Sequence, residues 1–135
     1  MSWQAYVDTS LVGSGHIDKA CIVSAAGDSI WAGTTGFNPK PEELKVIAAI
    51  LNEGAKDHSQ IKDTVFADGL FVGGERFVVT RVADRSGYAR AGKEGIVLVL
   101  TKQAILIGHH GENTIAGNAS ATVESLADYL IGQGY

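Results

Sequence analysis

The sequence has 135 residues, enough to bury a core of its own, and we expect one domain that spans residues 1–135. Its hydrophobic fraction of 45% and mean hydropathy of +0.09 are typical of a globular protein in water. Wholly apolar runs such as Ile96 to Leu100 are too short to span a bilayer, and the N-terminus lacks the charged and apolar regions of a secretory signal. These features predict a cytoplasmic protein without a transmembrane segment.

The net charge of −4 is distributed unevenly along the chain. Between Glu75 and Lys102, six basic residues accompany three acidic ones, a local balance of +3 that leaves −7 for the rest. Such a segment favours an acidic partner surface or an anionic head group, but it is equally typical of a solvated sheet whose edge strands carry lysine and arginine. It does not favour nucleic acid, because basic residues would then dominate the whole domain.

The single cysteine, Cys21, lies in an apolar segment and cannot form an internal disulfide, which fits a reducing compartment. A buried strand cysteine usually acts as a small hydrophobe, and no Cys/His spacing indicates a metal site. His109 and His110 stand near Glu112, but adjacent residues of an extended segment point to opposite faces and no ligand set accompanies them. We expect one of these histidines to be a packed or hydrogen-bonded loop residue.

Two glycine-rich segments, Gly13-Ser14-Gly15 and Gly73-Gly74, are candidates for a phosphate-binding loop. Both lack the strand-to-helix context and the Lys-Ser/Thr pair of such a loop. The sequence therefore predicts no enzyme activity, no catalytic residue, no metal and no cofactor.

The first twelve residues predict a helix. Ser2 can act as its N-cap, and Trp3, Tyr6, Val7 and Leu11 then follow at helical spacing along one stripe. A large apolar stripe usually packs on a sheet, so this pattern taken alone makes Trp3 a core residue.

A hairpin and a second helix come next. The predicted hairpin has strands from Ile17 to Ser24 and from Ser29 to Gly33, with a turn at Ala26-Gly27-Asp28 and with Trp31 in the second strand. The helix begins at Pro41, because proline followed by acidic residues is typical of a first turn, and it ends at Gly54. Its buried stripe comprises Leu44, Ile47, Ala48 and Leu51.

After a polar loop from Ala55 to Lys62, the sequence predicts short strands separated by glycine-rich turns. Such short spacings cannot hold crossover helices, so the strands pair antiparallel. The predicted strands are Gly69 to Val72, Arg76 to Val82, Gly87 to Arg90, Ile96 to Lys102 and Ala104 to Gly108, with a turn at Ala83 to Ser86. A loop from His109 to Asn118 leads into the last helix.

The final stretch, AGNASATVESLADYLIGQGY, predicts a helix with a clear apolar stripe. The stripe consists of Val123, Leu126, Ala127, Leu130 and Ile131. Tyr129 lies roughly 130° from the centre of this stripe, so we expect it on the flank of the helix. Together with Tyr135 it supplies exposed flat aromatic rings, which are typical of grooves that bind polyproline II segments.

These elements together predict an α+β fold, an antiparallel β-sheet with helices on both faces. The N- and C-terminal helices are expected to pack together on one face, because each has an apolar stripe to bury. This arrangement would bring the terminal aromatic residues over the hairpin that holds Trp31.

Five motifs distributed along the chain are SWQAYVD, LVGSGHIDKA, ADRSGY, TKQAILIGHH and ESLADYLIGQGY. Together they resemble profilin, most closely the fungal, amoebal and plant type. The resemblance runs from end to end, and its terminal motifs are specific. It implies the profilin fold and, with it, binding surfaces for several partners.

The first implied surface binds poly-L-proline. The positions that match it are Trp3, Tyr6, Trp31, Tyr129, Leu130 and Tyr135. In such a groove, aromatic faces stack on proline rings, while Trp N–H or Tyr O–H groups donate to ligand carbonyls. The implied partners are proline-rich proteins, namely formins and related elongation factors.

The second implied surface binds monomeric actin through the central strands and the start of the last helix. The positions that match it are Phe66, Ala67, Arg76, Val79, Arg81, Arg90, Lys93, Gly117, Ala121 and Ser125. Arg81 is the strongest candidate, because a basic strand residue beside small apolar neighbours can bury area and still pair with an acidic partner. Vertebrate profilins differ near Arg76 and Ser125, and the match is loose from His109 to Thr114.

The third implied ligand is the head group of phosphatidylinositol bisphosphate. Its phosphates would be held by Arg76, Arg81, Arg85 and Arg90, because guanidinium groups bind phosphates in a forked geometry. Which of these arginines contact lipid is poorly defined by the resemblance, and the lipid site can overlap the actin face.

The resemblance thus implies a regulator of actin polymerisation that binds monomeric actin, promotes nucleotide exchange on it and docks on proline-rich segments. One alternative is a phosphoinositide-binding membrane-signalling module with weak actin binding. Another is an adaptor for proline-rich peptides that does not bind actin. The expected location is the cytoplasm, with the actin cytoskeleton and the cell cortex.

Overall fold

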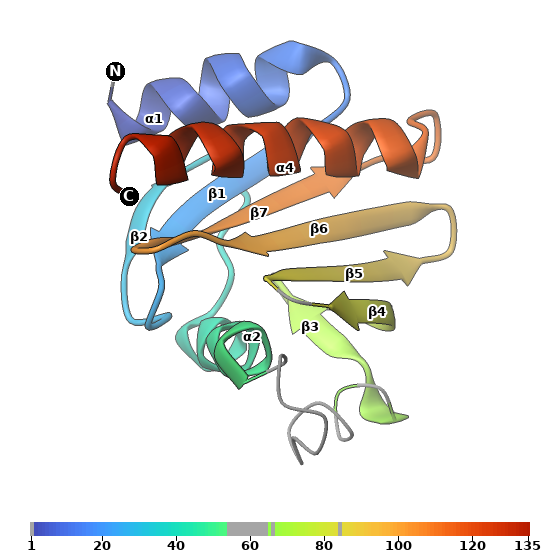
Figure 1. Cartoon of the computed structure of the whole chain (residues 1–135). Coiled ribbons are helices and arrows are strands. Elements are labelled where there is room, and N and C mark those ends of the chain that lie inside the picture. The colour runs from blue at the N-terminus through green and yellow to red at the C-terminus, as the bar shows by residue number, and fades with distance from the viewer. Residues whose placement is uncertain (1, 54–64, 66, 84) are drawn as a thin grey trace.

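A computed structural model describes residues 2–53, 65, 67–83 and 85–135. Within these ranges seven strands form one antiparallel sheet in the order β2-β1-β7-β6-β5-β4-β3, and Figure 1 shows helices on both of its faces. The strands are β1 (Lys19–Ser24), β2 (Ile30–Gly33), β3 (Leu70–Val72), β4 (Glu75–Ala83), β5 (Ser86–Ala91), β6 (Glu94–Leu100) and β7 (Ala104–His110). The predicted fold class, an α+β fold with an antiparallel sheet between helices, is confirmed.

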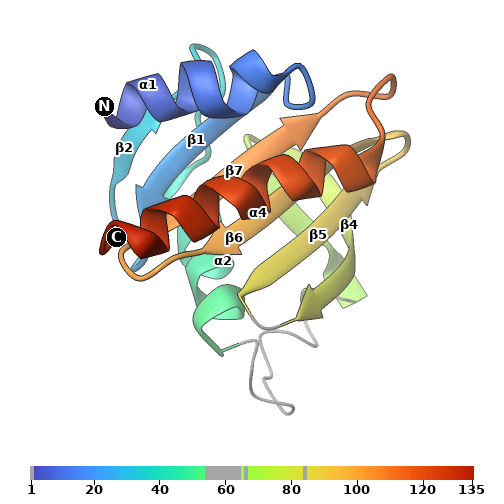
Figure 2. The same ribbon diagram turned by 45° about the horizontal axis from the view of Figure 1, so that its top comes forward.

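The two terminal helices lie side by side on one face of the sheet, and α2 covers the other face (Figures 1 and 2). The N-terminal helix begins as α1 (Trp3–Ala5) and continues without a break as η1 (Tyr6–Leu11) and η2 (Val12–Ser14). The other helices are α2 (Pro41–Glu53) and α4 (Ala116–Gly132). None of the helices in the described ranges is long and apolar enough to cross a membrane.

Local signals in the sequence explain both ends of the N-terminal helix. The hydroxyl of Ser2 accepts a hydrogen bond from the Ala5 N–H at 3.1 Å, which confirms the predicted N-cap. In η1 the helix is wound more widely, and the Val12 N–H donates to the Val7 carbonyl five residues earlier. Gly15 then ends the helix with a φ of 82°, a left-handed conformation that glycine adopts without strain.

The sheet separates two apolar cores. On the side of the terminal helices, Ile22 and Leu106 pack with the stripes of the N-terminal helix and α4. On the side of α2, Cys21 and Ile107 pack with the helix stripe that the sequence predicts. Burial raises the pKa of the Cys21 thiol to about 12, so the thiol remains neutral and acts as a small apolar side chain.

Gly108 allows α4 to approach the sheet closely. A Cβ atom at this position would lie 2.9 Å from Cγ2 of Val123 and 3.0 Å from Cδ1 of Ile17. Any larger residue in the middle of β7 would therefore push α4 away from the strands that it covers.

Most strand boundaries differ by one or two residues from the sequence-based prediction. β1 begins at Lys19, and β6 ends at Leu100. The loop expected from His109 onward is wrong, because β7 continues through His110, where His109 pairs with Lys19 and His110 pairs with Gly95. Both histidines are buried in the sheet. The predicted loop at 55–62, the helix end at Gly54 and residue Asp84 of the predicted turn lie outside the described residues.

Glu43 connects the first turn of α2 to the β3–β4 hairpin. Its carboxylate is buried and accepts hydrogen bonds from the backbone N–H groups of Lys40 at 2.7 Å, Gly73 at 2.7 Å and Gly74 at 2.9 Å. The bond to Lys40 caps the helix N-terminus, where the helix dipole also favours a negative charge. The position of the hairpin therefore depends on this side chain.

We predict that Glu43→Ala lowers the free energy of unfolding by about 1–3 kcal/mol, because three backbone donors lose their acceptor. The matched control is Glu42→Ala, which removes an exposed carboxylate from the same turn and should change stability by less than about 0.5 kcal/mol. Urea denaturation followed by circular dichroism measures both values. Equal stability losses in the two variants would show that Glu43 does not connect α2 to the hairpin.

Candidate functional site

Five aromatic residues from three separate parts of the chain form one surface cluster. Trp3 is at its centre, with its ring centroid 4.9 Å from that of Trp31, 5.8 Å from Tyr6 and 5.1 Å from Tyr135. Tyr129 joins the cluster through Tyr6, at a centroid distance of 6.2 Å. We call these five residues the aromatic patch.

The aromatic patch is partly core and partly surface. Tyr129 is 49% exposed and Tyr135 is 41% exposed, whereas Tyr6 is buried and both tryptophans are half-buried. The flank position predicted for Tyr129 agrees with this exposure. The rings of Trp3 and Tyr6 therefore pack against the core, while Tyr129 and Tyr135 make the patch accessible at the surface.

Leu130 does not share this surface. Its side chain is 0% exposed and lies in the core beneath α4, as its place in the helix stripe requires. Its side chain is therefore not exposed on the aromatic patch, unlike those of Tyr129 and Tyr135.

The turn between β6 and β7 fixes the position of Tyr135. The main-chain oxygen of Tyr135 accepts hydrogen bonds from the Thr101 hydroxyl at 2.8 Å and from the Gln103 N–H at 2.6 Å. The side-chain amide of Gln103 also donates to the carbonyl of Gly134 at 3.3 Å. These contacts hold the Tyr135 ring edge-on against Trp3. Sequence analysis missed Thr101 and Gln103, because no local pattern relates a turn to a chain segment more than 30 positions later.

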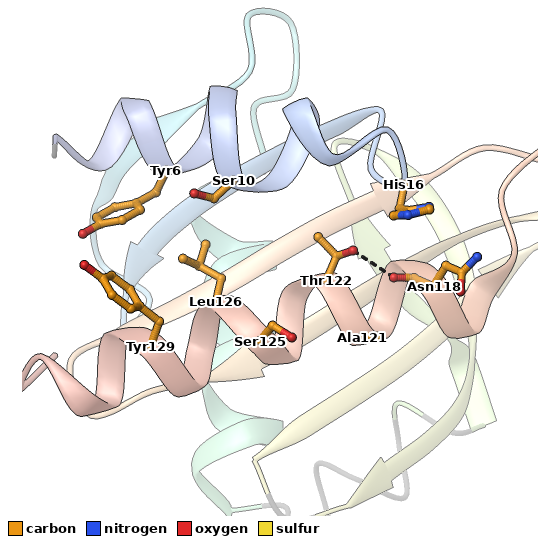
Figure 3. Close-up of a pocket in the computed structure, with 9 residues that line it drawn as sticks. All are labelled: Tyr6, Ser10, His16, Asn118, Ala121, Thr122, Ser125, Leu126 and Tyr129. Carbon is orange, nitrogen blue, oxygen red and sulfur yellow. Dashed lines mark hydrogen bonds between the residues drawn. The ribbon is translucent and has the colours of Figure 1, made fainter.

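A groove of about 580 Å³ extends from the aromatic patch along the line between the N-terminal helix and α4. Figure 3 shows Tyr6 and Tyr129 at one end, with their hydroxyls toward each other, and His16 and Asn118 at the other end. Burial raises the pKa of Tyr6, and the neighbouring Tyr129 raises it further, so the Tyr6 phenol stays protonated and can donate a hydrogen bond at neutral pH.

A second surface, on the other flank of α4, is the uncovered part of the sheet at β4 and β5. Strand pairing puts Val78 opposite Arg90 and Arg81 opposite Tyr88, with Thr80 as an extra, unpaired residue between the two pairs. This β-bulge places Arg81 on the same side as Val78 and Arg90. Alternation along β4 places Arg76 on this side as well, and strand pairing puts it opposite Phe71 of β3. We call Phe71, Arg76, Val78, Arg81 and Arg90 the open face.

The open face combines apolar and basic groups. Val78 is 50% exposed, Phe71 is similarly exposed, and all three arginines are exposed. Sequence analysis missed Phe71 and Val78. The sequence feature that could have identified them is an apolar side chain at the outward position of a strand whose inward positions are already apolar.

The other residues expected on the actin surface are only partly grouped with the open face. Gly117 lines a cavity of about 270 Å³ together with Thr80, Tyr88 and Arg90. Ala67 and Lys93 are exposed, whereas Phe66 lies outside the described residues. Val79 differs from the expectation, because it is 6% exposed and packs in the core on the α2 side.

Ala121 and Ser125 line the groove between the terminal helices. They are therefore on the flank of α4 that faces away from the open face. On the near flank, Glu124 accepts hydrogen bonds from Tyr88 at 3.2 Å and from Ser86. Helical spacing separates Ser125 and Glu124 by about 100°, so these neighbours face different surfaces.

Arg85 is held within the protein. One of its guanidinium nitrogens lies 2.8 Å from a Glu124 oxygen and 2.7 Å from an Asp128 oxygen. Because two carboxylates already neutralise this arginine, it is a weaker candidate for a phosphate than the three arginines of the open face. The ion pairs connect α4 to the start of β5.

The buried histidines show no catalytic or metal-binding arrangement. Nδ1 of His109 lies 2.6 Å from an Asp18 oxygen, and its Nε2 lies 3.7 Å from Glu94 without a hydrogen-bond partner in the described part of the chain. The ring of His109 packs edge-on against Phe37 and Phe77 in the core. No group of three or more side chains that could hold a metal ion occurs among the residues that the structure describes.

Comparison with known proteins gives matches over the whole chain. The family model described as Profilin matches residues 1–135. The profilin of Schizosaccharomyces pombe is 47% identical over 135 residues and covers 100% of both chains. A crystal structure of S. pombe profilin has a TM-score of 0.89 at 46% identity, with 99% of this chain and 100% of that chain covered.

A more distant structure is mouse profilin IIa in complex with a double repeat from the FH1 domain of mDia1. It has a TM-score of 0.78 at 22% identity, covers 100% of both chains, and shows likeness of fold alone. The full-length family match and the identity to the S. pombe protein are much stronger. They show that this chain belongs to the profilin family.

Proposed function

We propose that this protein is an adaptor that binds monomeric actin through the open face and proline-rich segments through the aromatic patch. The observation that carries the proposal is the presence of two chemically different accessible surfaces on opposite flanks of α4. One consists of flat aromatic rings, and the other of exposed arginines around an apolar centre. The protein is not an enzyme, in keeping with its membership of the profilin family.

Docking of proline-rich segments follows from the chemistry of the aromatic patch. A polyproline II helix presents flat rings and free carbonyls, and it is extended before binding, so it loses little conformational entropy. The faces of Trp3 and Trp31 can stack on its rings, and the hydroxyls of Tyr6 and Tyr129 can donate to its carbonyls. A mouse profilin of the same fold has been solved with a double repeat from the FH1 domain of mDia1, and we propose a proline-rich partner of that kind for this chain.

Actin binding is proposed for the open face because its composition suits an acidic protein partner. Val78 and Phe71 offer apolar area, and Arg76, Arg81 and Arg90 surround it with positive charge. By holding the monomer there while the aromatic patch engages an elongation factor, the protein would raise the local actin concentration at a growing filament end. We include promotion of nucleotide exchange on actin in this proposal, and a location in the cytoplasm and at the cell cortex.

A second candidate function is binding of phosphatidylinositol bisphosphate head groups. The supporting observation is the alignment of Arg76, Arg81 and Arg90 on one side of the sheet. Arg85 is left out of this proposal because Glu124 and Asp128 engage it. A lipid bound there would compete with actin for the same arginines.

We predict that Tyr129→Ala weakens binding of a poly-L-proline peptide about tenfold, because it removes one exposed ring and one donor. Both tryptophans of the chain belong to the aromatic patch, so a peptide titration followed by intrinsic fluorescence measures the affinity. The control, Phe71→Ala, removes an equally exposed ring from the open face and should leave the affinity unchanged. Failure of the wild-type protein to bind would reject the proposed docking.

We predict that Thr101→Val weakens the same peptide about threefold, because the ring of Tyr135 loses the support of one hydrogen bond to its main-chain oxygen. Thr101→Ser should restore the affinity, since serine keeps the hydroxyl. Circular dichroism melting of both variants separates loss of fold from loss of ring position. An unchanged affinity in a folded Thr101→Val protein would show that Thr101 does not position Tyr135 for binding.

We predict that Arg81→Glu weakens actin binding about tenfold, because a like charge then faces an acidic partner. Lys45→Glu makes the same charge change on the exposed side of α2 and serves as the control. Inhibition of spontaneous actin assembly measures actin binding, and sedimentation with vesicles that contain phosphatidylinositol bisphosphate measures lipid binding. Loss of lipid binding with actin binding retained would favour the membrane-signalling alternative.

A further inference from the structure

Trp31 of the aromatic patch belongs to an edge strand. β2 is the outer strand of the sheet and pairs with β1 alone, next to the start of the N-terminal helix (Figure 2). Ile22 pairs with Ala32 and Val23 pairs with Ile30, so Trp31 is an extra residue in a β-bulge. Pairing with β1 therefore does not by itself fix the position of Trp31.

The side chain of Gln4 binds to the outer edge of this strand. Its amide nitrogen donates to the Gly33 carbonyl at 3.0 Å, and its amide oxygen accepts from the Gly33 N–H at 3.3 Å. A neighbouring strand would bond to the same two groups, which an edge strand otherwise leaves to solvent. Gln4 thus takes the place of one residue of a further strand, although it belongs to a helix.

A third hydrogen bond orients the Gln4 amide. Its nitrogen also donates to a carboxylate oxygen of Asp8, one helical turn further on, at 3.1 Å. Gly33 needs a donor opposite its carbonyl and an acceptor opposite its N–H, and Asp8 only accepts, so a single orientation of the amide satisfies all three bonds. Gln4 and Asp8 are both exposed, so the bonds lie outside the core.

These bonds connect the two tryptophans of the aromatic patch. Gln4 follows Trp3 directly, and Gly33 lies two residues after Trp31. The two indole rings meet at a centroid distance of 4.9 Å and an interplanar angle of 47°. Apolar contact is not directional, whereas hydrogen bonds constrain both distance and angle. The position of one ring relative to the other therefore depends on Gln4.

We infer that Gln4 is a positioning residue for the binding of proline-rich segments, and that it acts through Trp3 and Trp31 and not by contact with the ligand. This inference rests on the docking proposed for the aromatic patch and adds to it a residue outside the aromatic set. A polyproline II ligand carries its rings at a fixed spacing, so the two indoles must lie at a matching separation. Rings that are already held there need no ordering when the ligand binds.

The experiment measures the affinity of the full chain for a peptide of about ten prolines by isothermal titration calorimetry. Gln4→Met keeps the approximate length of the side chain and removes all three hydrogen bonds. The affinity should fall about three- to tenfold, because the ligand must then order the two rings.

The matched control is Gln133→Met. Gln133 is exposed at the end of α4, and its side chain has no hydrogen-bond partner in the described part of the chain. The same substitution there should leave the affinity for the peptide unchanged.

Circular dichroism gives a readout that a purely structural role would not change. Two indole rings in contact produce a coupled signal in the far ultraviolet, and this signal depends on the angle between them. Gln4→Met should weaken or reshape the coupled signal while thermal unfolding remains cooperative. Gln133→Met should keep the wild-type signal.

Gln4→Glu provides a second test if Gln4→Met does not fold. Its carboxylate can accept from the Gly33 N–H, but it cannot donate to the Gly33 carbonyl and it repels Asp8. The affinity should again fall about three- to tenfold. Gln133→Glu controls for the added charge and should bind as the wild-type protein does.

Three results would overturn the inference while the proposed docking stands. The first is an unchanged affinity in a folded Gln4 variant, and the second is an equal loss in the matching Gln133 control. The third is a loss of affinity with an unchanged coupled signal, since Gln4 would then act without moving the rings. If the wild-type protein binds no peptide, the docking at the aromatic patch is itself rejected, and the inference falls with it.

Discussion

Strand β7 is buried along its whole length and on both faces, and the rest of the molecule is arranged around that constraint. Because its side chains alternate between two cores, the sheet must carry a helical layer on each side. The terminal helices form one of these layers, and Gly108 sets how near α4 can come. The aromatic patch arises from this requirement, since the two ends of the chain must meet over the same strands.

α4 is the element that both proposed surfaces share. Its buried stripe belongs to the core, one flank lines the groove, and the other flank is joined to β5 through Glu124. Rotation of α4 about its axis would therefore disturb the core, the groove and the contact with β5 together. The ion pairs of Arg85 with Glu124 and Asp128 oppose such a turn. The two surfaces are therefore held at a fixed relative position while remaining apart.

The helical periods and the turn chemistry predicted the fold class, the helix stripes and the exposed flank position of Tyr129. These features depend on residues within about two helical turns of each other, which is the range over which a sequence pattern carries information. The assembly of the aromatic patch was predicted because the apolar stripes of both terminal helices were expected to pack on the same face of the sheet. The burial of Leu130 follows from its place in the α4 stripe, whereas the family match does not distinguish a ring on the surface from the core residue beside it.

Contacts between distant parts of the chain were not predictable. The anchoring of Tyr135 by Thr101 and Gln103, and the attachment of Glu43 to the β3–β4 hairpin, join segments that share no local pattern. The continuation of β7 through His109 and His110 was missed because a histidine pair with no apolar neighbour after it is typical of a loop. The outward face of Arg81 was predicted through the family resemblance and not from the strand pattern, since strict alternation would place it with Phe77 and Val79 in the core.

The bulge that turns Arg81 outward also determines how β4 can change length. β4 carries one residue more than its pairing with β5 requires, and that residue is Thr80. A descendant sequence that lost Thr80 would keep every other side chain of the strand on its present side. Loss of a single residue elsewhere in the strand would instead shift one segment by a half-period and bury a charge. A deletion at Thr80 is therefore compatible with an outward Arg81, whereas a deletion elsewhere in the strand is not.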